Sequence, residues 1–516
     1  SNNTAVGHWA LLDNTTGTRN TAVGTNALDA NTTADRNDAF GYNALTSNTT
    51  GTLNVALGDS TLSLNTTGDG NVGVGTGALN GNSTADYNTA VGLSAMTNNT
   101  TGYDNVAIGK SALETATTAI NNVAIGKAAM DSTTTGGNNV AVGKSAMDAN
   151  TTGTQNVAVG TFALDANTTA IDNTAIGYNA LGDNSNGVSN TAVGRSALGS
   201  NTTSSNNVAI GAEALQSNTT GTRNLAIGRA ALGSNTTVSD NVAVGHNALY
   251  YNSGSQNTAL GSLAADASGH TASDTTAIGY GALSSNTTGG SNTAVGHTAM
   301  LDNTTGNSNV AVGRLALANC TTGSENSTLG RGTALNLTTG DQNTCVGNEA
   351  GHDLTTGDNN LLLGKSAGRS NSPAGISSED NRIVLGNNSI THAYIKVDWT
   401  VTSDERDKAD IANFTKGLDI VNALRPVTYK WDMRSDYSDD LSSTPDGSKK
   451  SSKTEIGLIA QEVETVEKAN GYKDDYLFVD KTTNGKTYGL KYSRLIPVLI
   501  NAIKELSTKI TALEAK

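Results

Sequence analysis

Short apolar runs recur along the chain at a strict distance from one another. At residues 105–109 the chain reads Asn-Val-Ala-Ile-Gly, and close variants of this run begin every 17 residues from Asn3 to Asn360, in 22 copies. Asn opens every copy except the one at Thr275, Gly closes all of them, and only the copy at Asn257 is shifted by one position. A repeat of this regularity is typical of a solenoid, in which each unit is one turn of a larger structure.

Each unit contains one alternating run and one turn. Val106 and Ile108 lie on one face of the run, and the small Ala107 lies on the other. Ala112 and Leu113 supply a second apolar contact, and the Asn-Thr-Thr-Gly segment, exact in eight units and varied in others, favours a turn. A unit of this length is too short for a strand plus a packed helix. The pattern therefore predicts a mainly β fold, a parallel β-solenoid or β-roll of 22 seventeen-residue coils.

The invariant Gly and the recurring Asn both have structural explanations. Gly is required where the backbone turns with positive φ or where another backbone approaches closely, and the pattern alone allows either explanation. The Asn side chains are expected to stack from coil to coil as a ladder of amides. Each coil offers only about four apolar positions, a thin core against the entropy of ordering the chain. We therefore expect identical rods to pack side by side and to bury their small Ala and Gly face between them.

Periodicity and composition divide the chain into three parts. Residues 1–364 are the solenoid shaft, residues 365–402 are a connector with a β-rich neck at 393–401, and residues 403–516 are richer in charged and aromatic side chains. The third part predicts a small α+β domain. Its expected elements are a helix at 411–424, a strand at 427–431, a buried strand at 456–460, a helix at 461–468 and a hairpin that turns at Asn484 and Gly485.

The last residues, from about 493 to 516, predict a coiled coil. Their apolar side chains alternate at spacings of three and four, which is a heptad seam: Ile496, Leu499, Ile503, Leu506, Ile510 and Leu513. Ile at one seam position with Leu at the other favours two strands in isolated peptides. A short seam joined to a large rod takes its oligomeric order from the rod, so we discount that preference.

Composition excludes several classes of function. The formal net charge is −14 and the pI is about 4.8, which argues against a nucleic-acid partner. No apolar run is long enough to span a membrane. Cys320 and Cys345 stand at different positions of the repeat, which indicates isolated thiols in a reducing compartment. A carbohydrate-cleaving site needs paired carboxylates in an aromatic cleft, and the repeats carry only scattered carboxylates and almost no Trp.

Four segments of the last part resemble one known family. They lie at residues 402–408, 424–431, 456–463 and 492–506, in this order, and they resemble the C-terminal intramolecular chaperone domain of phage tail fibres and tailspikes, including endosialidase spikes. The resemblance covers about residues 381–516. It implies a domain that trimerises, drives the folding of the β-rich fibre ahead of it and then cuts itself off. Separately, the repeat units resemble the shorter Asn-x-Ala-x-Gly coils of trimeric adhesin heads.

The resemblance implies a Ser-Lys pair, Ser403 and Lys408, as the catalytic residues of self-cleavage, with Thr402 and Asp404 flanking the cleaved bond. A Ser hydroxyl becomes a good nucleophile when a neighbouring base removes its proton, and a desolvated Lys can be that base. This chain departs from the family pattern at Asp407, where relatives carry an apolar residue. A carboxylate there favours the charged ammonium and works against a Lys base.

The residue after the invariant Gly is often basic, aromatic or His, and a solenoid aligns these residues in one column. The candidate receptor contacts in this column are Lys110, Lys127, Lys144, Arg195, Arg229 and Arg314. The column is either a solvated edge that offsets an acidic body or a binding site for an anionic surface glycan. The His residues of the column are too far apart along the rod to chelate one ion, so we expect no metal and no cofactor.

These observations predict a structural phage tail fibre protein, a homotrimer that attaches to a host-surface glycan or protein. It would assemble in the host cytoplasm and reside in the virion tail, with other tail proteins joined upstream of residue 1. The only expected catalysis is self-cleavage by the Ser-Lys pair, with no activity on another substrate. The alternative is a bacterial trimeric surface adhesin or extracellular fibre on the cell surface. A membrane-anchoring end is expected in that class, whereas this sequence ends in a predicted coiled coil.

Overall fold

The computed structural model describes residues 2–370, 372–397, 399–434, 437, 442–472, 477–481 and 488–515. The chain divides into two compact units, Ser1–Asn309 and Val310–Lys516. Both contain short parallel strands at the predicted repeat, and the second unit continues into a small region of helices and two-stranded sheets. The predicted fold class, a mainly β solenoid followed by a small C-terminal α+β region, is therefore confirmed.

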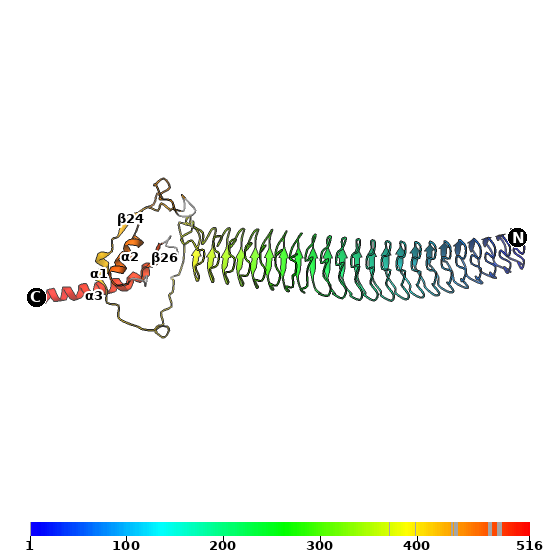
Figure 1. Cartoon of the computed structure of the whole chain (residues 1–516), viewed down its shortest axis with the longest axis horizontal. Coiled ribbons are helices and arrows are strands. Elements are labelled where there is room, and N and C mark those ends of the chain that lie inside the picture. The colour runs from blue at the N-terminus through cyan, green and yellow to red at the C-terminus, as the bar shows by residue number, and fades with distance from the viewer. Residues whose placement is uncertain are drawn as a thin grey trace. The chain divides into compact units, whose positions relative to one another are not determined.

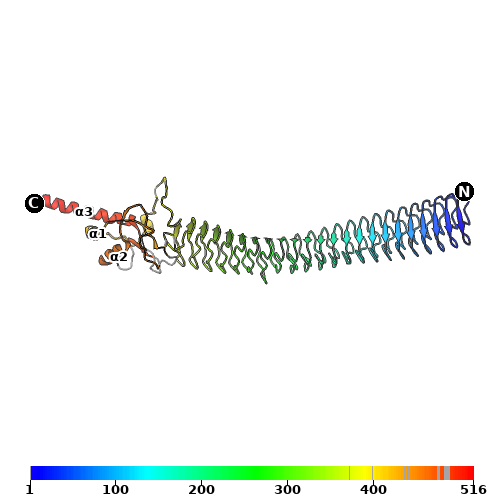
Figure 2. The ribbon, with the colours of Figure 1, turned by 90° about the horizontal axis from the view of Figure 1, so that it is seen from above.

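The first unit contains eighteen strands, one in each repeat, stacked along the blue-to-green part of the ribbon (Figures 1 and 2). Each strand pairs in parallel with the next, so that Ala107 lies opposite Ala124 one repeat later. The strands are β1 (Thr4–Val6), β2 (Thr21–Val23), β3 (Asp38–Phe40), β4 (Val55–Leu57), β5 (Val72–Val74), β6 (Thr89–Val91), β7 (Val106–Ile108), β8 (Val123–Ile125), β9 (Val140–Val142), β10 (Val157–Val159), β11 (Thr174–Ile176), β12 (Thr191–Val193), β13 (Val208–Ile210), β14 (Leu225–Ile227), β15 (Val242–Val244), β16 (Thr258–Leu260), β17 (Thr276–Ile278) and β18 (Thr293–Val295).

The small residues of each strand face the interior of their own coil. Ala107, Ala112 and Leu113 are fully buried, whereas Val106 is half-buried and Ile108 is 39% exposed. The expectation that the Ala and Gly face packs against identical chains is therefore wrong. The alternation of the strand is confirmed, but its small side chains point into the coil and its large ones point out. A residue as small as Ala at the inward position leaves room in the coil interior for the buried Leu of the same coil.

The Asn residues form the predicted amide ladder. The backbone N of Asn122 donates to Oδ1 of Asn105, 3.0 Å away, and Nδ2 of Asn105 donates to the carbonyl oxygen of Ala119 at 2.8 Å. The same two bonds recur along the column, where the Asn side chains are buried. Each ladder Asn thus satisfies one backbone donor of the next coil and one carbonyl of its own, which buried polar groups require.

The invariant Gly meets both of the conditions that the sequence left open. Gly126 has φ of +139°, and a Cβ atom placed on it would lie 2.3 Å from the carbonyl oxygen of Gly143. A side chain at this corner would therefore be strained in its backbone and would also collide with the next coil.

The shifted repeat at Asn257 keeps its place in the ladder. Its backbone N donates to Oδ1 of Asn241 at 3.0 Å, and its own Oδ1 accepts from the backbone N of Thr275 at 3.0 Å. The irregularity is absorbed in the turn that follows, where His270 is fully buried with Nδ1 2.7 Å from the carbonyl oxygen of Asn286.

In the second unit, five more strands continue the repeat. They are β19 (Val310–Val312), β20 (Ser327–Leu329), β21 (Thr344–Val346), β22 (Leu361–Leu363) and β23 (Ile383–Leu385), paired in parallel in that order. Strand β23 follows β22 by 22 residues, and the backbone N of Arg382 donates to Oδ1 of Asn360 at 2.9 Å. The sheet therefore extends one coil beyond the shaft limit at residue 364.

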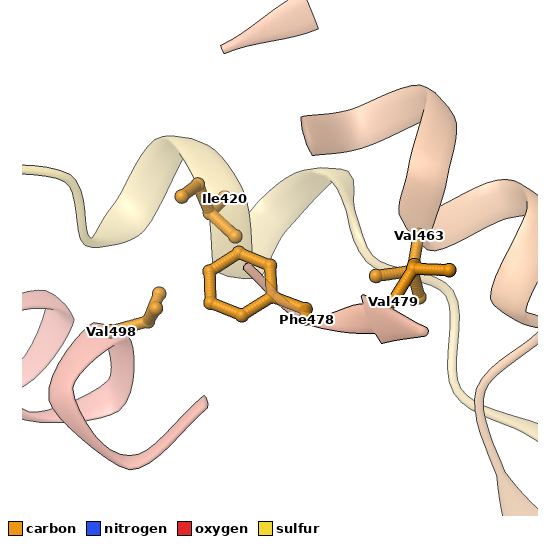
Figure 3. Packing of buried hydrophobic residues seen from close by; sticks show 5 residues of the cluster. All are labelled: Ile420, Val463, Phe478, Val479 and Val498. Carbon is orange, nitrogen blue, oxygen red and sulfur yellow. The ribbon is translucent and has the colours of Figure 1, made fainter. Parts of the chain in front are cut away.

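The C-terminal region of this unit combines helices with two antiparallel strand pairs, β24 with β25 and β26 with β27. Its elements are η1 (Glu405–Asp407), α1 (Leu418–Ala423), β24 (Val427–Tyr429), β25 (Glu455–Gly457), α2 (Ala460–Ala469), β26 (Val479–Lys481), β27 (Tyr488–Leu490), η3 (Tyr492–Arg494) and α3 (Leu495–Glu514). The core joins α1, α2, α3 and β26 with the residue before it, through Ile420, Val463, Phe478, Val479 and Val498 (Figure 3).

Several expected elements of this region differ from the structure. The helix predicted at 411–424 is shorter in the structure, where it is α1. Residues before α1 are held outside the helix by α3, because Asn501 Nδ2 donates to the carbonyl oxygen of Phe414. Gly417 then precedes the first helical turn. The helix predicted at 461–468 corresponds to α2 and is confirmed.

The expected strands of this region were only partly correct. The strand at 427–431 is confirmed as β24. The strand at 456–460 is shorter than expected and is not buried: Ile456 is 80% exposed, because β25 belongs to a sheet of only two strands. In the expected β-rich neck, residues 393–397 and 399–401 form no strand, since no other described segment pairs with them, and Trp399 is exposed. Asn484 and Gly485 lie outside the described residues, although β26 and β27 on either side pair as a hairpin requires.

Candidate functional site

The candidate cleavage site is built on a single turn of 3₁₀ helix, η1. Asp404 caps this turn: its Oδ1 accepts from the backbone N of Arg406 at 2.9 Å, and its Oδ2 accepts from the Arg406 guanidinium at 2.6 Å. These bonds, the side-chain one foremost, hold the pKa of Asp404 below its usual value. The turn closes where the backbone N of Lys408 donates to the carbonyl oxygen of Glu405 at 3.1 Å. The chain is thereby folded back on itself over five residues.

This turn brings the two predicted catalytic residues together. Lys408 Nζ donates to Ser403 Oγ at 2.7 Å and to the carbonyl oxygen of Ser403 at 3.1 Å. Both residues are exposed, as is Thr402, and Asp404 is half-buried. An exposed ammonium donates hydrogen bonds and does not accept a proton, whereas burial favours the neutral amine that can act as a base. The geometry of the pair is in place in the single chain, but the surroundings that a Lys base needs are not.

Asp407 stands on η1 with its side chain exposed. Within the described residues it makes no ion pair with Lys408, whose ammonium is directed to Ser403 instead. The predicted opposition of Asp407 to a neutral lysine would therefore act through space and solvent, where such effects are weak.

The six candidate receptor residues are all exposed. Five of them lie in the first unit, and Arg314 lies in the second. Hydrogen bonds between successive coils fix the spacing of the column: the backbone N of Ala128 donates to the carbonyl oxygen of Lys110 at 2.9 Å, and that of Ser145 to Lys127 at 3.0 Å. Arg195 is neutralised by an ion pair with Glu213 of the next coil. The column is therefore aligned as predicted, but its charges differ from one coil to another.

Two features were missed in the sequence. The Asp-x-Arg spacing of Asp404 and Arg406 carried the signal of a capped turn, since Asp is a preferred cap and the guanidinium can chelate it. The second is an apolar stripe on the outer face of the strands, which we call the outer stripe: Phe40, Leu57, Ile108, Ile125, Ile176, Ile210 and Leu260, each at least 36% exposed. The alternation of the strands carried its signal, but we expected the Ala and Gly face, and not the Val and Ile face, to be the exposed one.

The two cysteines replace inward-facing residues of the repeat and are free and buried. Burial raises the pKa of the Cys320 thiol to about 11 and that of Cys345 to about 12. Both therefore stay protonated and unreactive at neutral pH. Of the helices in the described part of the chain, none has the length and apolar character to cross a membrane.

A comparison with known families finds a match within the second unit. Residues 403–472 match the sequence model of a family described as the chaperone of endosialidase. The matched segment begins at Ser403 and includes the turn that carries Lys408. No curated protein matches the chain. The solenoid together with this match fits a tailspike or tail fibre that carries a chaperone domain behind its repeats.

Proposed function

We propose that this protein is a trimeric phage tail fibre whose solenoid forms the shaft and whose C-terminal region folds the trimer and then releases itself. The observation that carries this proposal is the order of the parts: a repetitive β-solenoid is followed by a segment similar to the chaperone of endosialidase. The fibre would assemble in the host cytoplasm and join other tail proteins upstream of residue 1. Its exposed column would attach the virion to the host surface.

Two apolar surfaces support the trimer. The outer stripe runs along the first unit, and a continuous exposed apolar surface of this kind is typical of an interaction site. In α3, the seam residues remain exposed, Ile503 at 66% and Leu506 at 46%, while Val498 and Ala502 face the core of the domain. Because identical chains carry the same surfaces, parallel association in register would bring each of them beside its own copies.

Self-cleavage follows from the chemistry of the pair. Lys408, made neutral by burial in the trimer, takes the proton of Ser403 Oγ, which attacks the carbonyl carbon of Thr402. The bond from that carbon to the nitrogen of Ser403 breaks, the nitrogen takes a proton, and an ester joins Thr402 to Ser403 Oγ. Water then hydrolyses the ester, which leaves a carboxylate on Thr402 and the hydroxyl and amine of Ser403. Assembly would thus precede cleavage.

A time course on denaturing gels tests this proposal, with the native mass of each sample measured by light scattering. We expect wild-type trimers to release a fragment of residues 403–516 slowly, and the Asp407→Leu variant to release it faster, because an apolar neighbour favours the neutral lysine. Ser403→Ala and Lys408→Ala should form trimers and stay intact. The matched control is Lys416→Ala, which removes a charge nearby without touching the pair and should cleave at the wild-type rate.

Two outcomes contradict different parts of the proposal. If wild type and Asp407→Leu are trimeric and stay intact for days, the region acts as a chaperone only and the catalytic assignment is wrong. If the wild-type chain is a stable monomer at micromolar concentration, the trimeric fibre itself is refuted.

A further inference from the structure

One part of the exposed column differs from its remainder in charge and composition. Over six consecutive coils it presents Lys110, Lys127, Lys144, Thr161, Tyr178 and Arg195, and the aromatic Phe162 stands directly after Thr161. We call this surface the lysine-aromatic strip. It belongs entirely to the first unit and spans roughly 24 Å at one strand spacing per coil.

The three lysines of the strip form a ladder of like charges. Their backbones are locked one coil apart, because the amides of Ala128, Ser145 and Phe162 donate to the carbonyl oxygens of Lys110, Lys127 and Lys144 at 2.9, 3.0 and 3.1 Å. Like charges on side chains that start one coil apart repel one another unless an anion lies between them. Among the described residues, no carboxylate forms an ion pair with any of the three.

Several arginines of the first unit stand beside a carboxylate. Arg195 pairs with Glu213, and Arg223 pairs with Asp240 at 2.7 Å. Arg19 and Arg36 also stand one coil apart, and both lower the pKa of Asp35, although bonds from Thr18 lower it more. The lysine ladder is therefore unusual in a chain with net charge −14, which supplies many carboxylates.

The aromatic end of the strip is held in place by its neighbours. Lys144 Nζ lies 5.3 Å from the ring centre of Phe162, and Phe162 meets Tyr178 edge to ring at 6.2 Å between centroids. Tyr178 is 56% exposed. An exposed aromatic ring beside a cationic group offers a flat apolar face and charge together, the two properties that a sugar acid presents in complementary form.

We propose that the lysine-aromatic strip binds a linear acidic polysaccharide that lies along the shaft. Its carboxylates bridge successive lysines, and a sugar ring stacks on Tyr178. The coil spacing suits this ligand because it is close to the length of one sugar unit in an extended chain. The proposal deepens the host attachment proposed above and names the class of receptor. A folded acidic protein would not match a charge at every coil.

One column of acidic residues lies on the same coils as the lysines, at Glu114, Asp131 and Asp148, and continues on the next coil at Asp165. Burial and the neighbouring carboxylates raise the pKa of Asp131, and no lysine is among the charges that act on it. An anionic ligand would be repelled by this acidic column and attracted by the lysines.

Binding to the full-length chain is measured by fluorescence anisotropy, with a labelled linear oligogalacturonate long enough to span the strip as probe. The Lys110→Gln/Lys127→Gln variant should bind it about tenfold more weakly or worse, since charge-assisted hydrogen bonds are lost. The matched control, Arg19→Gln/Arg36→Gln, removes two charges at the same spacing and should bind like wild type. Affinity should fall as salt is raised. Tyr178→Leu should weaken binding at unchanged salt dependence.

Any of three results overturns the inference: wild type fails to bind the probe, the two double variants lose affinity equally, or a DNA oligomer of equal charge binds more tightly. Light scattering on the same samples separates this failure from that of the proposed function. A trimeric fibre that ignores the probe removes only the polysaccharide site, and a monomer that binds it through the strip removes only the trimeric fibre.

Discussion

A coil of the solenoid and the C-terminal helix α3 differ in how far one chain satisfies their side chains. In the coil that begins at Asn105, the inward Ala107, Ala112 and Leu113 and the ladder Asn itself are all fully buried by the same chain. Helix α3 buries Val498 and Ala502 but leaves its whole seam exposed. The inward side chains of the coil are buried within one chain, whereas the seam of the helix is left exposed by one chain.

This difference separates two sources of order. The solenoid repeats one local solution, in which each coil offers its neighbour the same hydrogen bonds and the same small side chains, so its stability is the sum of like steps. The C-terminal region is aperiodic, and its contacts join residues distant in sequence. Leu418 N donates to Glu505 across the domain at 3.1 Å, for example. The first kind of order needs one chain, and we infer that the second needs three.

The largest expected effect comes from the exposed seam. Ile503→Asp should weaken the trimer by about a hundredfold or more, because three carboxylates would be forced together in an apolar core. The control Thr508→Asp introduces the same charge at an exposed position of α3 outside the seam and should leave the trimer intact. Mass photometry across a dilution series checks both. Equal behaviour of the two variants would show that the seam is solvated, and the contrast with the coil would be lost.

The next effect concerns the corner of the coil. Gly126→Ala should cost about 3 kcal/mol or more, since the added Cβ would meet the carbonyl oxygen of Gly143 in a backbone that only Gly adopts freely. Gly269→Ala is the control: φ there is +80°, but nothing lies within 4 Å of the new atom, so the cost is about 1–2 kcal/mol. Thermal unfolding followed by circular dichroism measures both. A smaller loss for Gly126→Ala than for Gly269→Ala would contradict the close approach of the coils.

A smaller effect is expected from the ladder. Asn122→Ala removes the acceptor of the Asn139 backbone N, 3.0 Å away, and leaves that buried donor unpaired at a cost of about 2 kcal/mol. Asn98→Ala changes an exposed Asn outside the ladder and should stay within about 0.5 kcal/mol. Denaturant unfolding distinguishes them. If both variants are as stable as wild type, the hydrogen bonds of the Asn ladder do not contribute measurably to the stability of the solenoid.

Much of the solenoid could be predicted because its information is local and repeated. The period fixes the register of every strand, and the recurring Asn and Gly indicate a ladder and a corner. The side of the strand that faces inward could not be predicted, because alternation tells which side chains share a face but not over which face the coil closes. Val106 and Ile108 have the apolar character of a core, yet the smaller Ala107 occupies it.

The C-terminal elements were predicted in kind but not in length. Their limits depend on distant contacts, as where Asn501 holds the backbone at Phe414 out of a helix. The Ser403 and Lys408 pair could be named from motif resemblance alone. Its contact depends on the cap made by Asp404 and Arg406, a local signal that was present but was not used.

The smallest expected effect is a pH dependence of stability caused by one buried side chain, His270. It tests whether a coil of the solenoid can contain a polar group that its own chain leaves without a partner, as the C-terminal region leaves apolar groups exposed. His270 stands in the turn of its coil, where the neighbouring coils carry Asn252 and Asn286, and burial lowers its pKa from the usual value of 6.5. Among the described residues its Nε2 has no hydrogen-bond partner. The unfolded chain therefore takes up the proton more readily than the folded one, and stability that is complete above pH 6.5 is lost as the pH falls below it.

We expect the free energy of unfolding to decline by at most about 1.4 kcal/mol per pH unit in this range on account of His270. His270→Asn restores the residue that the neighbouring coils carry at this turn position and should flatten the profile between pH 7 and 5. His246→Asn, at an exposed position of the column, should leave the slope unchanged. Denaturant unfolding at several pH values measures the slopes. If the slope is unchanged in His270→Asn, the loss of stability at low pH comes from other titrating groups, such as the carboxylates of the chain. The burial of His270 would then cost the irregular coil no stability at low pH.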